Sequence, residues 1–313
     1  MSHIRRLLSA ALLFSAPWIL FAENEERFSE AELDQMLAPI ALYPDALLAQ
    51  ILTASTYPLE IVAAERWLQE HKNLEGDQAV EAAESKNWDP SVTALVAFPD
   101  ILKRMNDDLE WTQRLGEAVL IQQEEVMASV QKLREKAYTA GNLRSHEEVE
   151  VRREKEIIYI ESSNPRVVYV PYYNPTIVYG SWWWHSHPPV YWGPSTFVSI
   201  RTGSTRIVWS SGYRFSTHYF YSRPDWHRRH IVVHHHYHNR QKPNYVHRSR
   251  RDWDRYSSDN RWQHQPRHRR GARYQSTTAR ERFSHRNHPT ETTRTARERP
   301  NSANPAIQNR AER

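Results

Sequence analysis

The chain has 313 residues, a formal net charge of +5 and no cysteine. The absence of cysteine excludes a disulfide framework, a thiol nucleophile and a thiolate metal site. Glycine is scarce, and no phosphate-cradling or nucleophile-elbow glycine motif occurs. The net charge conceals two opposed segments, because residues 23–156 are acidic and residues 223–313 are basic. These segments can attract different partners or each other.

Residues 1–22 predict a signal peptide. A positively charged start precedes the apolar run 7–20, and Ala22 offers a small residue for cleavage. The run is shorter than the ~20 residues that a membrane-spanning helix needs. Leu20 fits poorly at the −3 position, so an uncleaved anchor is the alternative. We therefore predict export, with no transmembrane span beyond this segment.

Residues 23–145 predict an acidic domain of helices. Ser29 followed by Glu32 forms a capping box before an apolar stripe with helical spacing. Aromatic–proline pairs mark further helix starts, because proline at the first helical position has no N–H to lose and a preset φ. These pairs are Tyr43-Pro44, Tyr57-Pro58 and Phe98-Pro99, and Asp89-Pro90 gives a fourth start. The short helices between them predict a compact orthogonal bundle.

One long helix is predicted from about Asp108 to Gly141, where Gly141-Asn142 offers a C-terminal cap. Its apolar stripe consists of Leu109, Val119, Val126, Val130, Leu133 and Ala137. In one interpretation this helix packs on its own domain. In the other it forms a dimeric coiled coil.

Residues 146–222 predict a small aromatic-rich β region. Ile157–Ile160 is a β-branched run, and a repeat follows at Asn164-Pro165 and again at Asn174-Pro175. Asn-Pro favours a turn and the residues after each pair favour strands, so we expect an antiparallel meander of about three strands. Such a sheet is too small to be stable alone and should pack on the helices. The predicted fold class is therefore α+β.

Four motifs between residues 30 and 180 are long enough to identify relatives. They are Leu37–Gln50 (LAPIALYPDALLAQ), Tyr57-Pro58, Trp88–Val92 (WDPSV) and the Asn-Pro-x-Val-Val-Tyr-Val-Pro repeat. Together they resemble a family of exported bacterial proteins catalogued as domain of unknown function number 3300. The resemblance implies an N-terminal helical domain, a variable C-terminus, and the periplasm or cell envelope of a Gram-negative-type bacterium. It implies no activity, cofactor or catalytic residue.

Residues 223–313 predict a basic, low-complexity tail that is largely disordered, because it has too few aliphatic residues to offset its chain entropy. Arginine interleaved with aromatic residues suits an anionic surface such as lipid, lipopolysaccharide or cell wall, or the protein's own acidic domain. The candidate anion-binding residues are Arg250, Arg251, Arg267, Arg269 and Arg270. Nucleic acid is less favoured, because export separates the chain from cytoplasmic RNA. A solvated spacer is the alternative.

Two other clusters are candidate binding groups. Imidazole is a ligand for Zn²⁺, Cu²⁺ and Ni²⁺, so weak divalent metal binding is predicted in the tail, and no other cofactor is expected. The candidate ligands are His234, His235, His236 and His238. The consecutive Trp182, Trp183 and Trp184 can stack on sugars, lie at a membrane–water interface or pack on the helices.

The missing catalytic motifs favour a non-enzymatic envelope protein, whose helical domain binds an envelope protein and whose tail tethers it to an anionic surface. One alternative is an enzyme or ligand-binding module for cell-wall glycan or peptide, and another is a metal-binding tail. The residues expected to line a cleft are Tyr43, Tyr57, Trp67 and Trp88. Asp45 and Asp100 follow prolines at helix starts, where they complement the helix dipole. Exposure of either in a pocket with a raised pKa would favour the enzyme.

Overall fold

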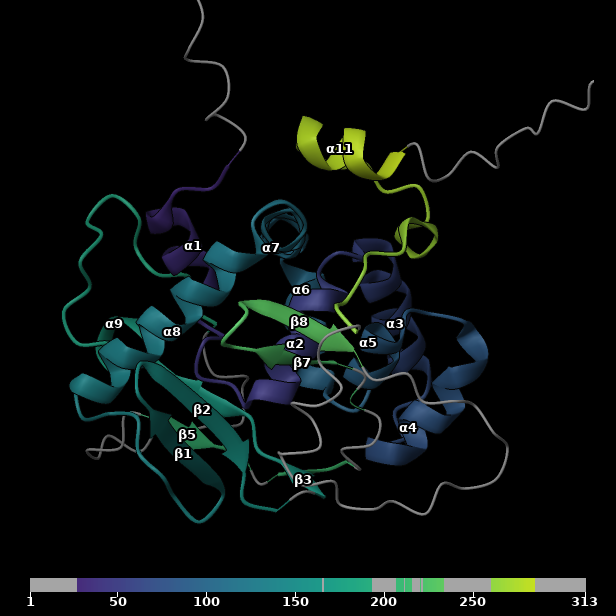
Figure 1. The fold of residues 1–313 in the computed structure, drawn as a ribbon. Helices are drawn as coiled ribbons and strands as arrows, with labels where there is room; N and C mark the ends of the chain where they lie inside the picture. The colour runs from purple at the N-terminus through teal and green to yellow at the C-terminus, as the bar shows by residue number, and fades with distance from the viewer. Residues whose placement is uncertain are drawn as a thin grey trace, which may run out of the picture.

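The computed structural model describes residues 27–164, 166–192, 207–210, 212–215, 220, 222–233 and 260–284. Within these residues the fold is α+β, as predicted, with small antiparallel sheets packed on a bundle of helices (Figure 1). One apolar core runs through the helices, the sheets and residues 260–284. The predicted signal peptide lies outside the described residues.

Most helices of the bundle begin at the predicted signals. The helices are α1 (Glu30–Leu37), α2 (Asp45–Ala54), α3 (Pro58–Glu70), α4 (Gly76–Ala83), the 3-10 turn η1 (Glu84–Lys86), α5 (Pro90–Leu95), α6 (Pro99–Asp107), α7 (Leu109–Ile121) and α8 (Gln123–Thr139). Ser29 and Glu32 form the predicted capping box of α1. Proline occupies the start of α3, α5 and α6. In α2 every residue from Leu47 to Ala54 is buried, which places this helix at the centre of the bundle.

Within the described residues, no single helix combines the length and apolar character that crossing a membrane requires. Helices α2 and α3 meet these criteria only as a pair bent by 111°.

The predicted single long helix is two helices, α7 and α8. Gln122 separates them with φ −148 and ψ 50. The Gln122 amide accepts a hydrogen bond from the Phe28 backbone N–H at 2.8 Å and donates one to the Phe28 carbonyl at 3.0 Å. The chain that enters α1 therefore binds at the break. The predicted stripe from Val119 to Ala137 is buried in this chain's own core, so that face is not available for a coiled coil.

The strands form two-stranded antiparallel sheets. The pairs are β1 (Val149–Glu154) with β2 (Ile157–Ser162), β3 (Val167–Val168) with β6 (Tyr213–Arg214), β4 (Pro171–Tyr173) with β5 (Ile207–Trp209), and β7 (Ser222–Asp225) with β8 (His230–Val233). The two strands after the first Asn-Pro pair therefore hydrogen-bond to residues 207–209 and 213–214. The second Asn-Pro pair opens helix α9 (Pro175–Val178) where we expected a strand. Asn174 caps this helix, because its side chain accepts from the Thr176 N–H at 3.0 Å.

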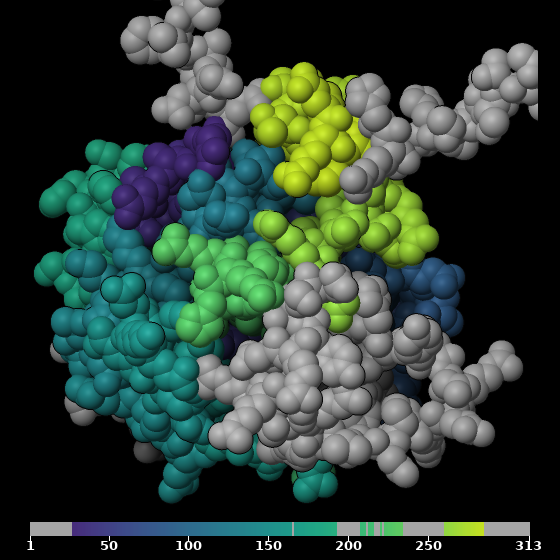
Figure 2. Space-filling view, in the orientation of Figure 1, coloured from purple at the N-terminus to yellow at the C-terminus, as the bar shows by residue number. Residues whose placement is uncertain are grey.

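Two stretches of the predicted tail are folded against the helices. The β7–β8 hairpin packs on α2, and the Gln50 amide donates to the Ser222 carbonyl at 2.9 Å. Residues 260–284, named here the C-terminal segment, contain the 3-10 turn η3 (Pro266–Arg269) and α11 (Thr277–Ser284). This segment contacts α3 and α7 and lies across the bundle in Figure 2. Its buried Trp262 and Phe283 join the core, although the composition of the tail as a whole is polar.

Candidate functional site

The acidic helices carry buried and half-buried carboxylates that accept hydrogen bonds from later parts of the chain. They are Asp34, Asp45, Glu60, Asp100 and Glu117. Removing a carboxylate from water is unfavourable unless donors replace the lost hydration. These contacts therefore decide where the second half of the chain can dock.

Asp34 binds two of the three predicted contact tryptophans. The indole N–H groups of Trp183 and Trp184 donate to its Oδ2 at 3.2 and 2.7 Å. Lys132 also binds Asp34, at 2.7 Å, and its ammonium lies 5.2 and 5.1 Å from the centroids of the same two rings. Trp182 stacks on Trp183 with 4.6 Å between ring centroids. This geometry favours packing on the helices, and sugar or membrane contact by these side chains stays a prediction.

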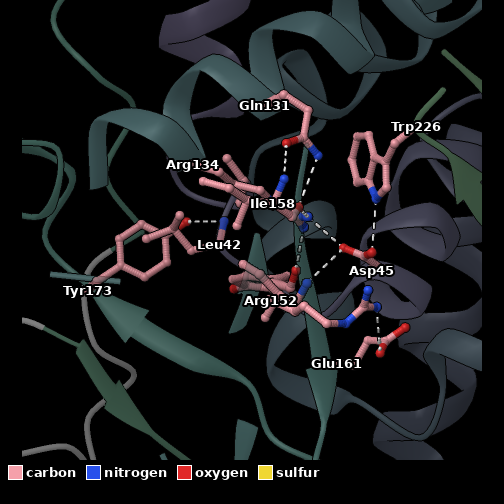
Figure 3. A network of polar contacts seen from close by, with 12 residues as sticks. Leu42, Asp45, Gln131, Arg134, Arg152, Ile158, Glu161, Tyr173 and Trp226 are labelled. Atoms are coloured by element: carbon pink, nitrogen blue, oxygen red, sulfur yellow. Dashed lines mark hydrogen bonds and ion pairs between the residues drawn. The ribbon is translucent and has the colours of Figure 1, made fainter. Parts of the chain in front are cut away.

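Asp45 forms one half of a buried ion pair (Figure 3). Arg134 on α8 is fully buried, and its Nη1 lies 2.6 Å from Asp45 Oδ1. The same guanidinium donates to the carbonyls of Ile158 at 2.8 Å and Tyr43 at 3.0 Å. Trp226 donates to Asp45 Oδ2 at 2.9 Å, and its ring centroid is 4.8 Å from the guanidinium of Arg134. The network ties α2, α8, β2 and the β7–β8 hairpin together.

Asp100 accepts two phenol hydrogen bonds, from Tyr172 at 2.9 Å and Tyr213 at 3.2 Å. Burial, with the nearby Asp100 charge, raises the pKa of Tyr172 to about 12. Burial also raises the pKa of Tyr213 well above its ordinary value. Both phenols therefore remain neutral donors over the physiological range. Like Asp45, Asp100 lines neither of the two cavities described below.

Arg269 of the C-terminal segment lies in the interior of the protein, where we expected a surface anion-binding residue. Its Nη2 is 2.8 Å from Glu117 Oε1, and the two side chains are 2% and 1% exposed. Its guanidinium also donates to the carbonyls of Thr56 at 3.0 Å and Arg273 at 2.6 Å. Burial lowers the pKa of Arg269, and the Glu117 charge opposes that change. The anion that Arg269 binds is supplied by the protein's own acidic domain.

Glu60 on α3 brings together further basic side chains of the same segment. Its carboxylate is 1% exposed, and Oε1 lies 3.0 Å from His268 Nδ1 and 3.1 Å from Arg270 Nε. Oε2 accepts from the Asp89 backbone N–H at 2.6 Å. Arg267 Nε donates to His268 Nε2 at 3.3 Å. Because Nε2 accepts this bond, the proton of a neutral imidazole lies on Nδ1 and is donated to Glu60.

A cavity of about 510 Å³ opens beside this cluster. It is lined by Glu60, Asn87, Trp88, Pro90, Arg267, His268 and Arg270. Its volume falls within the range of about 300–1,000 Å³ that is usual for small-ligand sites. Two of the predicted anion-binding arginines thus meet one of the predicted cleft aromatics. We did not predict Glu60, Asn87 or His268 as site residues.

The other predicted cleft aromatics, Tyr43, Tyr57 and Trp67, are buried in the core. Trp67 packs edge-on against Trp88 with 6.0 Å between ring centroids, and Tyr57 stacks on His264 of the C-terminal segment with 5.1 Å between ring centroids. Tyr57 accepts from the Gln265 N–H at 3.0 Å through its phenol oxygen. Tyr43 is buried, and burial raises its pKa well above the ordinary value. None of these three side chains lines either cavity.

A second cavity, of about 520 Å³, lies between the α7–α8 break and the C-terminal segment. Apolar Trp262 and Phe283 line it together with side chains of both charges, among them Arg261 and Glu125. The mixed charges define no single ligand chemistry. This cavity therefore enters no functional argument below.

No group of three or more His, Asp or Glu side chains that could hold a metal ion occurs in the described ranges. The candidate ligands His234, His235, His236 and His238 lie outside those ranges. The candidate anion-binding residues Arg250 and Arg251 also lie outside them. Weak metal binding and anion binding at these positions stay predictions.

Comparison with known proteins identifies relatives. The family described as protein of unknown function, DUF3300, matches residues 29–264. Uncharacterized protein YacH of Escherichia coli strain K12 is 36% identical over 212 residues, which cover 58% of this chain and 34% of that protein. The chain thus spans about a third of the length of that relative. No solved structure matches the chain. The match extends well past residue 180, where the predicted resemblance ended, and includes the β7–β8 hairpin.

Proposed function

The chain belongs to the DUF3300 family, and for this member we propose the role of an exported, non-enzymatic binding protein of the cell envelope. The helical bundle and the C-terminal segment form one scaffold in this proposal. Basic side chains outside the scaffold tether it electrostatically to an anionic surface of lipid, lipopolysaccharide or cell wall. A protein of the envelope is the partner of the scaffold itself.

This proposal rests on the hydrogen bonds that the acidic side chains accept from other segments of the same chain. A general acid or base must reach a proton of its substrate. Asp45, Asp100 and Glu117 instead accept hydrogen bonds from guanidinium, indole or phenol groups of the same chain. Carboxylates held in this way support packing between segments, which favours a scaffold over an enzyme.

The charge pattern supports the tether. Residues 260–284 provide the basic side chains that pair with Glu60 and Glu117. In residues 234–259 and 285–313, basic side chains outnumber acidic ones. We propose that this charge attracts a second, anionic partner, and such attraction weakens as added salt screens it.

Washing envelope fractions with NaCl tests this tether. The full chain should stay bound at low salt, at about 0.05 M, and be released as the concentration rises toward about 1 M. The double variant Arg250→Gln/Arg251→Gln should be released at a lower concentration. The matched control Arg273→Gln/Arg280→Gln removes the same charge from exposed positions of the scaffold and should behave like the unaltered chain. Release that does not depend on salt, or a mature protein found in the cytosol, would refute the proposal.

Ligand binding is a second candidate function, and the cavity beside Glu60 favours it. Arginine, histidine, an asparagine amide and a tryptophan line one solvent-open cavity there. Convergent polar groups beside an apolar wall are the usual composition of small-ligand sites.

A further inference from the structure

The cavity beside Glu60 exists only when the chain is fully assembled. Its lining comes from three separate stretches, which are α3, the turn between η1 and α5, and the C-terminal segment. Asn87 in that turn has φ 53 and ψ 38, a left-handed conformation that asparagine tolerates better than most residues. Docking of the C-terminal segment therefore closes a site from elements that lie far apart in the sequence.

The two arginines of the cavity retain unused donors. Arg270 uses its Nε to contact Glu60, and Arg267 uses its Nε to contact His268. Among the described residues, the terminal Nη atoms of these side chains have no carboxylate within ion-pair distance. The planar end of a guanidinium binds a carboxylate through two parallel hydrogen bonds. The cavity lining thus contains two guanidinium groups and one carboxylate residue, Glu60.

The charges that line the cavity sum to one positive unit. Arg267 and Arg270 contribute two positive charges and Glu60 contributes one negative charge, while His268 uses its two ring nitrogens in hydrogen bonds with Arg267 and Glu60. A ligand with one negative charge neutralises this sum. A phosphate monoester, with a charge of about −1.5 to −2 at neutral pH, would exceed it and repel Glu60.

The remaining lining requires a ligand larger than a carboxylate. Trp88 and Pro90 form an apolar wall, and Asn87 offers an amide donor and acceptor. The faces of sugar rings pack on aromatic side chains, and their hydroxyls pair with amide and guanidinium groups. We propose that this cavity binds a sugar acid, in which one pyranose ring carries one carboxylate. The inference deepens the ligand-binding function proposed above by naming the class of ligand.

Titration calorimetry of the full chain tests the proposal with four probes. D-glucuronate supplies the ring and one carboxylate, glucose lacks the charge, acetate lacks the ring, and glucose 6-phosphate carries the higher charge. Glucuronate should bind at least about tenfold more tightly than each of the other three probes, since each of those three fails to match the cavity in its ring or in its charge. Equal binding of acetate, tighter binding of glucose 6-phosphate, or no glucuronate binding up to millimolar concentration would each overturn the assignment.

Variants then locate the binding in this cavity. Arg267→Gln should weaken glucuronate binding about tenfold, because it removes one guanidinium that binds the carboxylate. The variant should stay folded, because Arg267 is exposed and its replacement leaves the Glu60–Arg270 contact in place. Arg273→Gln, an exposed arginine of the same segment outside the cavity, should bind as the unaltered chain does. Unchanged glucuronate binding in Arg267→Gln would place the ligand elsewhere. The salt-release experiment uses Arg250 and Arg251, so the tether and the sugar-acid site can fail independently.

Discussion

Replacement of Arg269 by methionine should undock the C-terminal segment from the helical bundle. Methionine keeps most of the apolar contact of the arginine stem but leaves Glu117 buried without its counter-ion. Breaking one side of a buried ion pair costs about 3–5 kcal/mol. A domain of this kind has a stability of about 5–15 kcal/mol, so the bundle itself should remain folded.

The structure supports the upper part of that range. Arg269 donates at 2.8 Å to Glu117 and at 3.0 Å to each of the Thr56 and Ala272 carbonyls. After the substitution, Glu117 retains the N–H of Gln275, at 3.0 Å, as its close donor. Arg269 also donates to the Arg273 carbonyl at 2.6 Å, so three neutral carbonyls and one carboxylate would lose a charged donor in a site that excludes water.

Hydrogen exchange measures this effect segment by segment. In the Arg269→Met variant, the amides of residues 260–284 should lose about 3–5 kcal/mol of protection while those of α2 keep theirs. The exposed Arg273→Met is the control and should change stability by less than about 0.5 kcal/mol. The double variant with Glu117→Gln should be more stable than the sum of the single effects predicts, by at least about 1 kcal/mol. Protection within 0.5 kcal/mol of the unaltered chain, or strictly additive effects, would refute the assignment of Arg269 as the docking residue.

Three further predictions concern the bundle. Gly116→Ala should destabilise the protein by about 2 kcal/mol or more in thermal unfolding, because its Cβ would lie 2.3 Å from the Ser55 carbonyl oxygen; an unchanged melting temperature would contradict this packing. Tyr172→Phe should reduce the loss of stability between pH 10 and 12 in urea titrations. The pKa of Tyr172 is raised from 10.0 to about 12 in the folded state, so the neutral phenol stabilises the folded protein below pH 10, and this contribution is lost as pH rises to 12. An identical alkaline profile would show that titration of Tyr172, with its pKa raised by burial, does not contribute to this loss. Ser29→Ala should cost about 1 kcal/mol in urea unfolding by removing the cap of α1, and a smaller loss than 0.3 kcal/mol would assign little weight to that cap.

The helical part could be predicted because its signals are local. A capping box and a proline at a first helical position act within one turn of chain, so Ser29, Pro58 and Pro99 each open a helix as expected. The break at Gln122 depends on a partner, Phe28, that lies far away in the sequence. Apolar periodicity continues through such a position and gives no sign of the break.

Strand pairing could not be predicted for the same reason. The residues after Asn164 have β propensity, and they form strands, but their partners come from residues 207–209 and 213–214. Propensity describes the residue and its neighbours and carries no information about which distant segment completes a sheet. At Asn174 the same Asn-Pro pair caps a helix, because an asparagine side chain serves a turn or an N-cap equally well.

The cavity beside Glu60 was predicted only in separate parts. Arg267 and Arg270 were chosen for charge, and Trp88 for its aromatic ring, without any indication that they meet. One signal was available in α3, where Glu60 falls on the buried face next to Ile61. An acidic residue within an apolar stripe requires a buried donor, so it predicts that a basic segment will dock on it.

Added salt should affect the buried and the solvent-exposed charges of the chain differently. The Glu117–Arg269 pair is 1% and 2% exposed, and screening by ions hardly reaches such a pair. Arginines that are open to solvent are screened within about 10 Å at 0.1 M salt. At molar salt the C-terminal segment should therefore remain docked while the proposed envelope tether is released. Hydrogen exchange on the released protein decides the matter, because loss of protection in residues 260–284 at that salt would mean that docking and tethering use the same exposed charges.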